Sequence, residues 1–267
     1  MSPDQVRFHI GAQGFGARDW VGTFYPPRTQ SGSYLEFYAR VFDTVEMNTT
    51  FYAIPSPAQV QEWAERTPPG FVFTAKLPKA ITHEKRLVDA ETELGYFCRS
   101  VRGFGAKLGA AVIQLPPSFS RESQPDLERF LALLPEDIRF AIEFRHRSWQ
   151  AQEVVALLRG RGLAWCMNDF RDLPPLTVAT ADFAYLRLNG YHDEFERITH
   201  VQRDRSGELD RWAQVLQDMS SSISHAYIYV NNHYAGHAPA TINDLRERLG
   251  LPRREPRDYW TQQPSLL

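Results

Sequence analysis

Short segments with one apolar face recur along this chain, separated by longer segments whose apolar residues return at helical spacing. The clearest short segment carries Phe140, Ile142 and Phe144 on one face and Glu143 and Arg145 on the other, which is the period of a β-strand. A buried charge without a partner costs several kcal/mol, so these two charges are expected to face each other, a ligand or water. The segment therefore predicts a strand whose carboxyl end belongs to a binding site.

The same alternation predicts about eight strands, and helical spacing predicts helices between them. The strands are predicted at residues 7–13, 44–48, 71–77, 110–115, 140–145, 163–168, 183–189 and 226–231. The helices are predicted at residues 34–42, 57–66, 90–107, 126–134, 150–161, 208–219 and 239–249. Ser56, three residues before Gln59, predicts the N-cap of the second helix, and Ser148 predicts the N-cap of the fifth.

About eight strands alternating with helices is the pattern of a TIM-type (β/α)8 barrel, an α/β fold. A length of 267 residues suits one such barrel, so we expect a single domain over residues 1–267. Pro174 and Pro175 follow the sixth strand without a clear helix, so the barrel is expected to be irregular after that strand. Inward-facing residues should become polar near the carboxyl ends of the strands, where the mouth of a barrel opens.

Composition narrows the classes of function and the compartment. The formal net charge of −2 argues against a basic surface for non-specific nucleic-acid binding. Cys98 and Cys166 form no close pair, so neither a disulfide framework nor a cysteine-based zinc site is expected. Residues 1–7 lack the apolar core of a signal peptide, and no apolar run approaches the roughly 20 residues of a membrane span. We therefore expect a cytoplasmic protein without a membrane partner.

Polar side chains at the carboxyl ends of the predicted strands should converge on one mouth. They are Glu46, Asn48, Lys76, Gln114, Glu143, Arg145, Asn168, Arg187, Asn189 and Asn231. Arginine holds phosphate or carboxylate with two parallel hydrogen bonds, and the amides suit sugar hydroxyls or phosphate oxygens. Three cations against two glutamates leave a positive surplus, so a small anionic ligand is expected, with Arg187 and Lys76 as its main anchors. Because a mouth is wet, replacing Arg187 with alanine is expected to leave the fold intact.

Catalytic roles are predicted for Glu46 and Glu143 as general acid and base, with His83 as a proton carrier. His146 and Trp149, just beyond the fifth strand, are predicted to contact the substrate. An alternative for Glu143 is a structural ion pair with the arginine two residues later. An open pocket between the two glutamates would favour catalysis, whereas a glutamate sealed against that arginine would favour binding or structure.

Several short motifs occur in a fixed order along nearly the whole chain. They are Gly11-x-x-Gly14-Phe15, Trp20-x-Gly22-x-Phe24-Tyr25-Pro26, Val45-Glu46-x-Asn48-x-Thr50-Phe51-Tyr52, Ile81-Thr82-His83, Gln114-Leu115-Pro116-Pro117-Ser118-Phe119, Glu143-Phe144-Arg145-His146-x-Ser148-Trp149, Arg187-Leu188-x-Gly190 and Asn231-Asn232. Together they resemble the YecE-like family, catalogued as a domain of unknown function. The resemblance implies a TIM-type barrel and no particular activity. Phe15, Asn189 and His233 stand where that family usually or often has Trp, His and Asp.

Three hypotheses of function follow. The first is a hydrolase- or isomerase-like enzyme that acts without a cofactor on a small phosphorylated or polyhydroxylated anion by acid–base chemistry. The second is a non-catalytic barrel that binds an anion or a nucleic acid. The third is a divalent-metal-dependent phosphodiesterase or nuclease using Glu46, Glu143, Asp169 and a histidine, against which the cations of the same mouth argue. The polar segment 191–207 is expected on the surface near the mouth, as a candidate lid.

Overall fold

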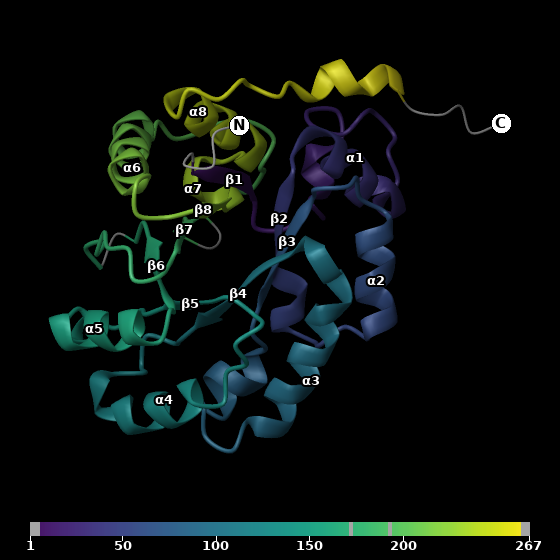
Figure 1. Ribbon diagram of the computed structural model, residues 1–267. Helices are drawn as coiled ribbons and strands as arrows, with labels where there is room; N and C mark the ends of the chain where they lie inside the picture. Colours follow the sequence, from purple (N-terminus) through teal and green to yellow (C-terminus); the bar gives the residue numbers. More distant parts are fainter. Residues whose placement is uncertain (1–5, 171–172, 192–193, 263–267) are drawn as a thin grey trace.

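Eight parallel strands close into a barrel in the order of the sequence, as the computed structural model shows (Figure 1). The structure describes residues 6–170, 173–191 and 194–262. The strands are β1 (Arg7–Ala12), β2 (Thr44–Met47), β3 (Val72–Lys76), β4 (Leu108–Gln114), β5 (Phe140–Glu143), β6 (Ala164–Asn168), β7 (Phe183–Leu188) and β8 (His225–Val230). The predicted TIM-type barrel is confirmed, and every predicted strand overlaps an observed one.

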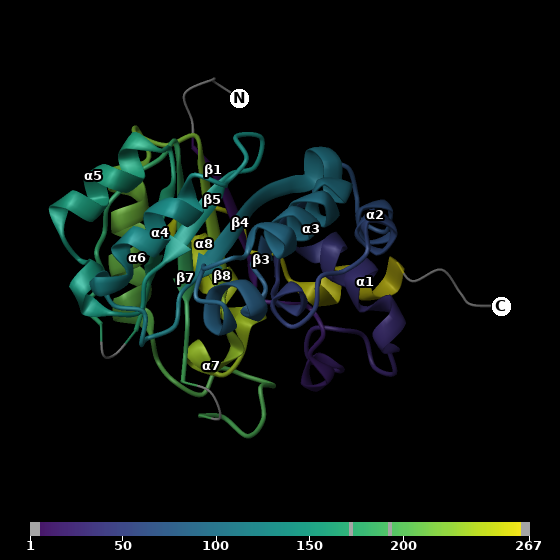
Figure 2. The same ribbon diagram turned by 90° about the horizontal axis from the view of Figure 1, so that it is seen from below.

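The first strand closes the barrel by pairing with both β2 and β8. Its register with β8 runs from Arg7 opposite His225 to Ala12 opposite Val230. Because all the strands run parallel, their carboxyl ends lie at one end of the barrel, and the side chains there share one mouth. The helix α7 begins directly after β8, so it lies at this end of the barrel (Figure 2).

Helices surround the barrel (Figures 1 and 2). The α-helices are α1 (Tyr34–Val41), α2 (Pro57–Glu65), α3 (Glu91–Val101), α4 (Gln124–Leu131), α5 (Gln152–Gly160), α6 (Ser206–Met219), α7 (Asn232–Ala235) and α8 (Ala238–Arg248). Shorter helical turns are η1 (Arg18–Trp20), η2 (Ser31–Ser33), η3 (Asn48–Phe51), η4 (Ala80–Glu84), η5 (Arg102–Lys107), η6 (Arg121–Ser123), η7 (Arg147–Trp149) and η8 (Pro256–Gln262). The described part of the connection from β6 to β7 contains no helix, in agreement with the predicted irregularity after the sixth strand.

Local signals set the helix ends in one case and mislead in another. The hydroxyl of Ser56 accepts a hydrogen bond from the backbone N–H of Gln59, so the predicted cap of α2 is confirmed. The predicted helix 90–107 is too long. Its α-helical part ends at Val101, and Gly105 at a φ of 55° interrupts the 3-10 turn that follows.

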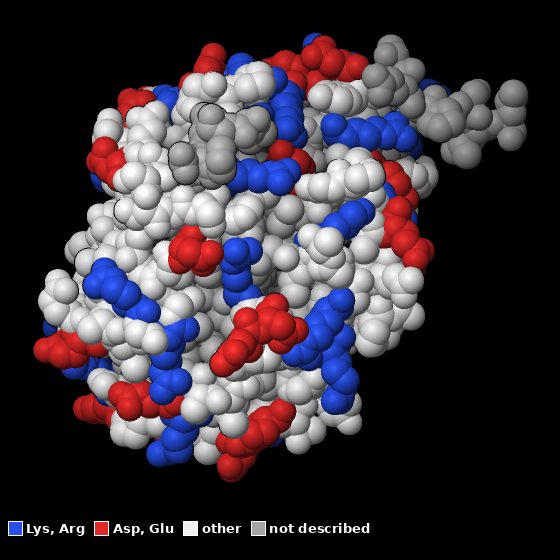
Figure 3. All heavy atoms as spheres, viewed as in Figure 1, with Lys and Arg blue, Asp and Glu red and all other residues white. Residues whose placement is uncertain are grey.

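The barrel interior is filled by a small cluster that is separate from the larger core under the helices. Cys166 and the tyrosines Tyr185, Tyr227 and Tyr229 belong to this interior cluster, and they form the floor beneath the mouth. Cys166 and Cys98 are both buried, free thiols. None of the helices that the structure describes is long and apolar enough to cross a membrane. On the face shown in Figure 3, acidic and basic side chains are interspersed.

Candidate functional site

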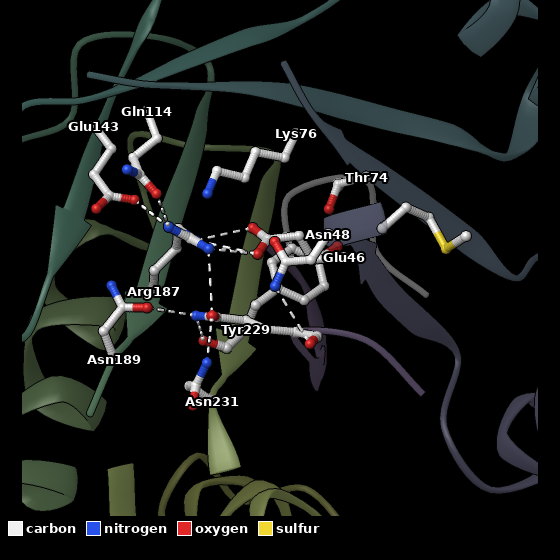
Figure 4. A network of polar contacts seen from close by, with 12 residues as sticks. Glu46, Asn48, Thr74, Lys76, Gln114, Glu143, Arg187, Asn189, Tyr229 and Asn231 are labelled. Carbon is white, nitrogen blue, oxygen red and sulfur yellow. Dashed lines mark hydrogen bonds and ion pairs between the residues drawn. The ribbon is translucent and has the colours of Figure 1, made fainter. Parts of the chain in front are cut away.

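Arg187, on the inward face of β7, is the centre of the polar network in the mouth (Figure 4). Its Nε lies 3.2 and 3.1 Å from the two carboxylate oxygens of Glu46, and its Nη2 lies 2.8 Å from Oε1 of the same group. On the other side, its Nη1 donates to the Glu143 carboxylate. The guanidinium therefore lies between the two glutamates, and the residue Arg187 is only 2% exposed.

The remaining donors of Arg187 are directed at two amide oxygens. Nη1 lies 3.5 Å from Oε1 of Gln114, and Nη2 lies 3.3 Å from Oε1 of Gln13. With its donors used inside the barrel, Arg187 has none left over for an exogenous anion. This corrects its predicted role as a main anion anchor. Arg187 is instead a structural residue that holds the two glutamates in place.

Gln13 and Tyr185 belong to this network but were not among the predicted site residues. Gln13 follows β1 and joins three strand ends, because its Nε2 donates to Asn189 Oδ1 at 2.8 Å while its Oε1 accepts from Asn231 Nδ2 at 3.1 Å. The Tyr185 hydroxyl donates to Glu46 Oε2 at 2.7 Å. Both residues lie on strand faces that the period of two had assigned to the barrel interior. The same alternation could therefore have added them to the predicted site residues.

Glu143 is held as an anion inside the protein. Its Oε1 accepts from Arg145 Nε at 2.7 Å, while Arg187 binds its other oxygen. Burial on its own would raise the pKa of Glu143, but the two guanidinium groups outweigh burial and hold this pKa at about 2. Glu143 and Glu46 are both 0% exposed, so neither carboxylate is accessible to solvent at the mouth. The structure thus brings the two predicted catalytic glutamates together as partners of Arg187 rather than as groups facing a pocket.

A cavity of about 340 Å³ opens above this network at the carboxyl ends of the strands. Its polar lining is Gln13, Asn48, Lys76, Lys79, His83, Gln114, Arg145, Arg187, Asn189 and Asn231, and its aromatic lining is Phe51, Tyr52, Phe170 and Tyr191. Most of the predicted binding residues therefore meet in one place. The cavity presents cations, amides and rings, and its lining contains no carboxylate among the described residues.

Lys76 at the end of β3 is 8% exposed, and its Nζ lies 3.7 Å from the centroid of the Phe51 ring. No hydrogen bond or ion pair joins this Nζ to any oxygen of residues 6–170, 173–191 or 194–262. Burial, followed by the neighbouring Arg187 guanidinium, lowers the pKa of Lys76 to about 7. The sequence-based expectation of a permanently charged Lys76 is corrected, because near neutral pH a large part of it is an uncharged amine.

His83 also lines the cavity, from the π-helical turn η4. Its Nδ1 lies 2.8 Å from the Thr82 hydroxyl, and its ring packs edge-on against Phe51. Burial, together with the charge of Lys76, lowers the pKa of His83 to about 4. The imidazole is therefore neutral at pH 7, with one nitrogen that donates a hydrogen bond and one that accepts.

Two amide atoms at the cavity wall have no partner within the described part of the chain. They are Oδ1 of Asn48, an acceptor, and Nδ2 of Asn189, a donor, and both atoms are buried. A buried polar atom without a hydrogen bond costs about 1–3 kcal/mol, so such atoms are usually satisfied by a ligand or water. A donor and an acceptor in the lining of one cavity suit the hydroxyl groups of a ligand.

His146 and Trp149 do not reach the cavity. The turn η7 directs the Trp149 ring behind the barrel, where it is fully buried, donates to the Phe119 carbonyl at 2.7 Å and stacks on Phe144. Nδ1 of His146 instead bonds with the Ser148 hydroxyl at 2.7 Å. Neither side chain belongs to the lining of this cavity.

The predicted cap at Ser148 is wrong. Its hydroxyl accepts from the backbone N–H of Arg121, and α5 begins only at Gln152. The turn η7 separates the end of β5 from this helix, and a turn of this kind has no periodic signal in the sequence.

Among the described residues, no group of three His, Cys, Asp or Glu side chains lies close enough to hold a metal ion. The oxygen ligands predicted for a metal ion are not assembled into one site. Glu46 and Glu143 both bind Arg187. Asp169 is held elsewhere, by the Trp212 indole and the Tyr234 hydroxyl, each 2.9 Å from its Oδ2.

The segment predicted as a lid lies at the surface beside α7 where the structure describes it, and residues 192–193 lie outside the described residues. Its backbone is joined to two other parts of the chain. The N–H of Ile198 donates to the Asp19 carboxylate at 3.1 Å, and the N–H of Gln202 donates to the Ala235 carbonyl at 2.7 Å. Tyr191 lines the cavity, so the segment adjoins the mouth, and its function as a lid stays a prediction.

Comparison with known proteins agrees with this fold. The model of the family described as "Protein of unknown function DUF72" matches residues 9–265. The UPF0759 protein YecE of Escherichia coli is 35% identical over 129 residues, which are 48% of this chain and 47% of that protein, so the match spans about half the length of this relative. The UPF0759 protein YunF of Bacillus subtilis is 24% identical over 91% of this chain and 95% of its own length.

Solved structures extend the agreement to three dimensions. A DUF72 family protein from Thermotoga maritima superposes with a TM-score of 0.76 at 29% identity, covering 90% of this chain and 96% of that one. A DUF72 family protein from Enterococcus faecalis gives a TM-score of 0.77 at 20% identity, covering 92% and 96%. With the family model matched across nearly all of its residues and the same barrel in two relatives, this chain belongs to the DUF72 family of proteins of unknown function.

Proposed function

We propose that this protein is an enzyme that acts on a small anionic, polyhydroxylated or phosphorylated compound in the mouth cavity. One observation carries the proposal: the Lys76 amine lies at the cavity without an oxygen partner among the described residues, and its pKa is about 7. A group whose pKa is near the operating pH both accepts and donates a proton efficiently, which is the requirement for general acid–base catalysis. Lys76 therefore takes the role of general acid and base that was predicted for the buried Glu46 and Glu143.

Arg145 and Lys79 are the cations that we assign to the anion. Only the Nε of Arg145 is engaged by Glu143, and no described residue accepts from its Nη groups, which belong to a guanidinium stacked 4.6 Å from the Phe170 ring centroid. Lys79 is half exposed and 3.5 Å from Glu84, an ion pair that is weak enough to exchange for a ligand. The amides of Asn48, Asn189 and their neighbours then suit the hydroxyl groups of the ligand.

The anion site is tested by calorimetric titration with inorganic phosphate and with glycerol phosphate. Each charged hydrogen bond contributes about 1.5–3 kcal/mol, so Arg145→Gln should weaken binding tenfold or more. Arg147→Gln is the matched control, because Arg147 is exposed and outside the cavity lining, and its affinity should equal that of the wild type. Equal affinities in wild type and Arg145→Gln would contradict the assignment of this cavity.

A second candidate is a non-catalytic barrel that binds the same anion. The burial of Glu46 and Glu143 favours it, because it removes the carboxylates that most acid–base mechanisms would use. The two functions differ in the effect of Lys76→Met. This variant should retain anion binding in both cases, and it should lose turnover only if the protein is an enzyme.

A further inference from the structure

The environment of Lys76 differs from that of every other lysine in the chain. There are only four, Lys76, Lys79, Lys85 and Lys107. Nζ of Lys107 donates to three oxygens at 2.6–2.9 Å, and Nζ of Lys85 contacts the Glu93 carboxylate at 2.7 Å. Lys79 pairs with a glutamate, whereas the Nζ of Lys76 faces an aromatic ring at the cavity.

The two nearest candidates for a counter-ion are already used. Glu46 and Glu143 are both bound by Arg187, which itself adds a fixed positive charge next to Lys76 (Figure 4). Burial and this guanidinium both favour the uncharged amine over the ammonium ion. An uncharged amine has a free electron pair, and a desolvated lysine beside another cation is the arrangement that activates lysine as a nucleophile toward carbonyl carbon.

We propose that Lys76 Nζ forms a Schiff base with the carbonyl group of an anionic hydroxyaldehyde or hydroxyketone, an inference that rests on the proposed function of the same cavity. The amine electron pair forms a C–N bond with the carbonyl carbon, and the carbonyl π pair moves to oxygen. After the amine proton leaves and the oxygen is protonated, the carbinolamine loses water to give an iminium ion. The net change is one carbonyl compound and one proton consumed and one water released, so no oxidant or reductant is needed.

The cavity supports both ends of such a substrate. The iminium product carries a positive charge where Phe51 presents its ring face, 3.7 Å from the present position of Nζ. Arg145 and Lys79 lie in the same lining for the phosphate or carboxylate end, and the unpaired atoms of Asn48 and Asn189 suit the hydroxyl groups between them. The iminium ion withdraws electrons from the adjacent carbon, so the supported reactions are proton removal or carbon–carbon cleavage at that carbon.

The test is reductive trapping followed by peptide mapping of the four lysines. The full chain is incubated with dihydroxyacetone phosphate or glyceraldehyde phosphate and sodium cyanoborohydride, and the adduct at each lysine is measured by mass spectrometry. We expect the adduct at Lys76 to exceed that at each other lysine at least tenfold, although Lys79 and Lys85 are more exposed. Its rate should rise with a midpoint near pH 7.

Two variants and one non-reactive ligand keep the outcomes distinct. Lys85→Arg changes a lysine outside the cavity lining and should leave trapping at Lys76 intact, whereas Lys76→Met should abolish cavity trapping without losing the cooperative unfolding transition. Glycerol phosphate has no carbonyl group, so it should bind and compete without forming an adduct. Labelling in proportion to exposure, or no adduct at Lys76 while glycerol phosphate still binds, would overturn the Schiff base and leave the anion site standing. Failure of both trapping and glycerol phosphate binding would overturn both proposals.

Discussion

Replacing Arg187 with methionine should destabilise this protein severely, because the change removes the cation between two fully buried carboxylates. Glu46 receives three contacts from this guanidinium within 3.2 Å, and Glu143 receives a further one. Removing one partner of a buried ion pair costs about 3–5 kcal/mol, since the other charge stays buried and uncompensated. This expectation reverses the sequence-based one, in which a wet mouth would have tolerated the loss of Arg187.

The assay is urea denaturation at pH 7 and pH 5. At pH 7 the variant should lose about 3–5 kcal/mol in the free energy of unfolding. Without Arg187, Glu143 loses one of the two guanidinium groups that oppose the effect of burial on its pKa. A carboxyl group whose pKa in the folded protein exceeds its unfolded value of about 4.3 is stabilised by acid, so the difference between wild type and variant should narrow at pH 5.

Two controls separate this effect from a general loss of arginine. Arg147→Met removes an exposed arginine and should change the free energy of unfolding by no more than about 0.5 kcal/mol. The triple variant Glu46→Gln, Glu143→Gln, Arg187→Met removes the charges together and should recover a substantial part of the loss. A cost below about 1 kcal/mol for Arg187→Met at pH 7, or a difference that widens at pH 5, would refute the reasoning.

Other consequences are open to direct measurement. Because the pKa of Lys76 is about 7 in the folded protein and about 10.4 in an unfolded chain, the folded protein binds fewer protons between these values, and wild-type stability should rise with pH in that window. The Lys76→Met variant lacks this titrating group. The free energy of unfolding of the wild type should therefore rise by up to about 2 kcal/mol relative to that of Lys76→Met from pH 7 to pH 9 in urea titrations. A difference that stays constant over this range would contradict the lowered pKa of Lys76. Gly190→Ala would place a Cβ 1.8 Å from the backbone oxygen of His233, so it should lower the melting temperature well below that of Gly207→Ala, whose Cβ meets no atom within 4 Å. Equal melting temperatures would show that β7 and α7 can separate without cost.

The sequence by itself determined the barrel and the inward faces of its strands. Alternation with a period of two decides which side chains share a face, and it needs no knowledge of distant residues. For this reason Glu46, Gln114 and Arg187 were all placed correctly in the interior of the mouth. The same local rule identified the cap at Ser56.

Only the tertiary structure decided which inward residues meet. Glu46 and Arg187 are 141 residues apart, and a period of two says nothing about which strands face each other across the barrel. The partner of a charged side chain determines its role. Arg187 is therefore the structural centre of the network, and the two glutamates that it binds are buried below the cavity. Lys76 was left beside the cavity without an oxygen partner among the described residues.

The period of two also does not predict the direction of side chains that follow the end of a strand. Trp149 follows β5 by only a few residues, but the turn η7 carries its ring to the outside of the barrel. Burial is likewise a property of the whole fold, and burial is what shifts the pKa of Lys76. The sequence therefore determined the scaffold and the set of candidate groups, whereas packing decided which of them are charged, paired and within reach of a ligand.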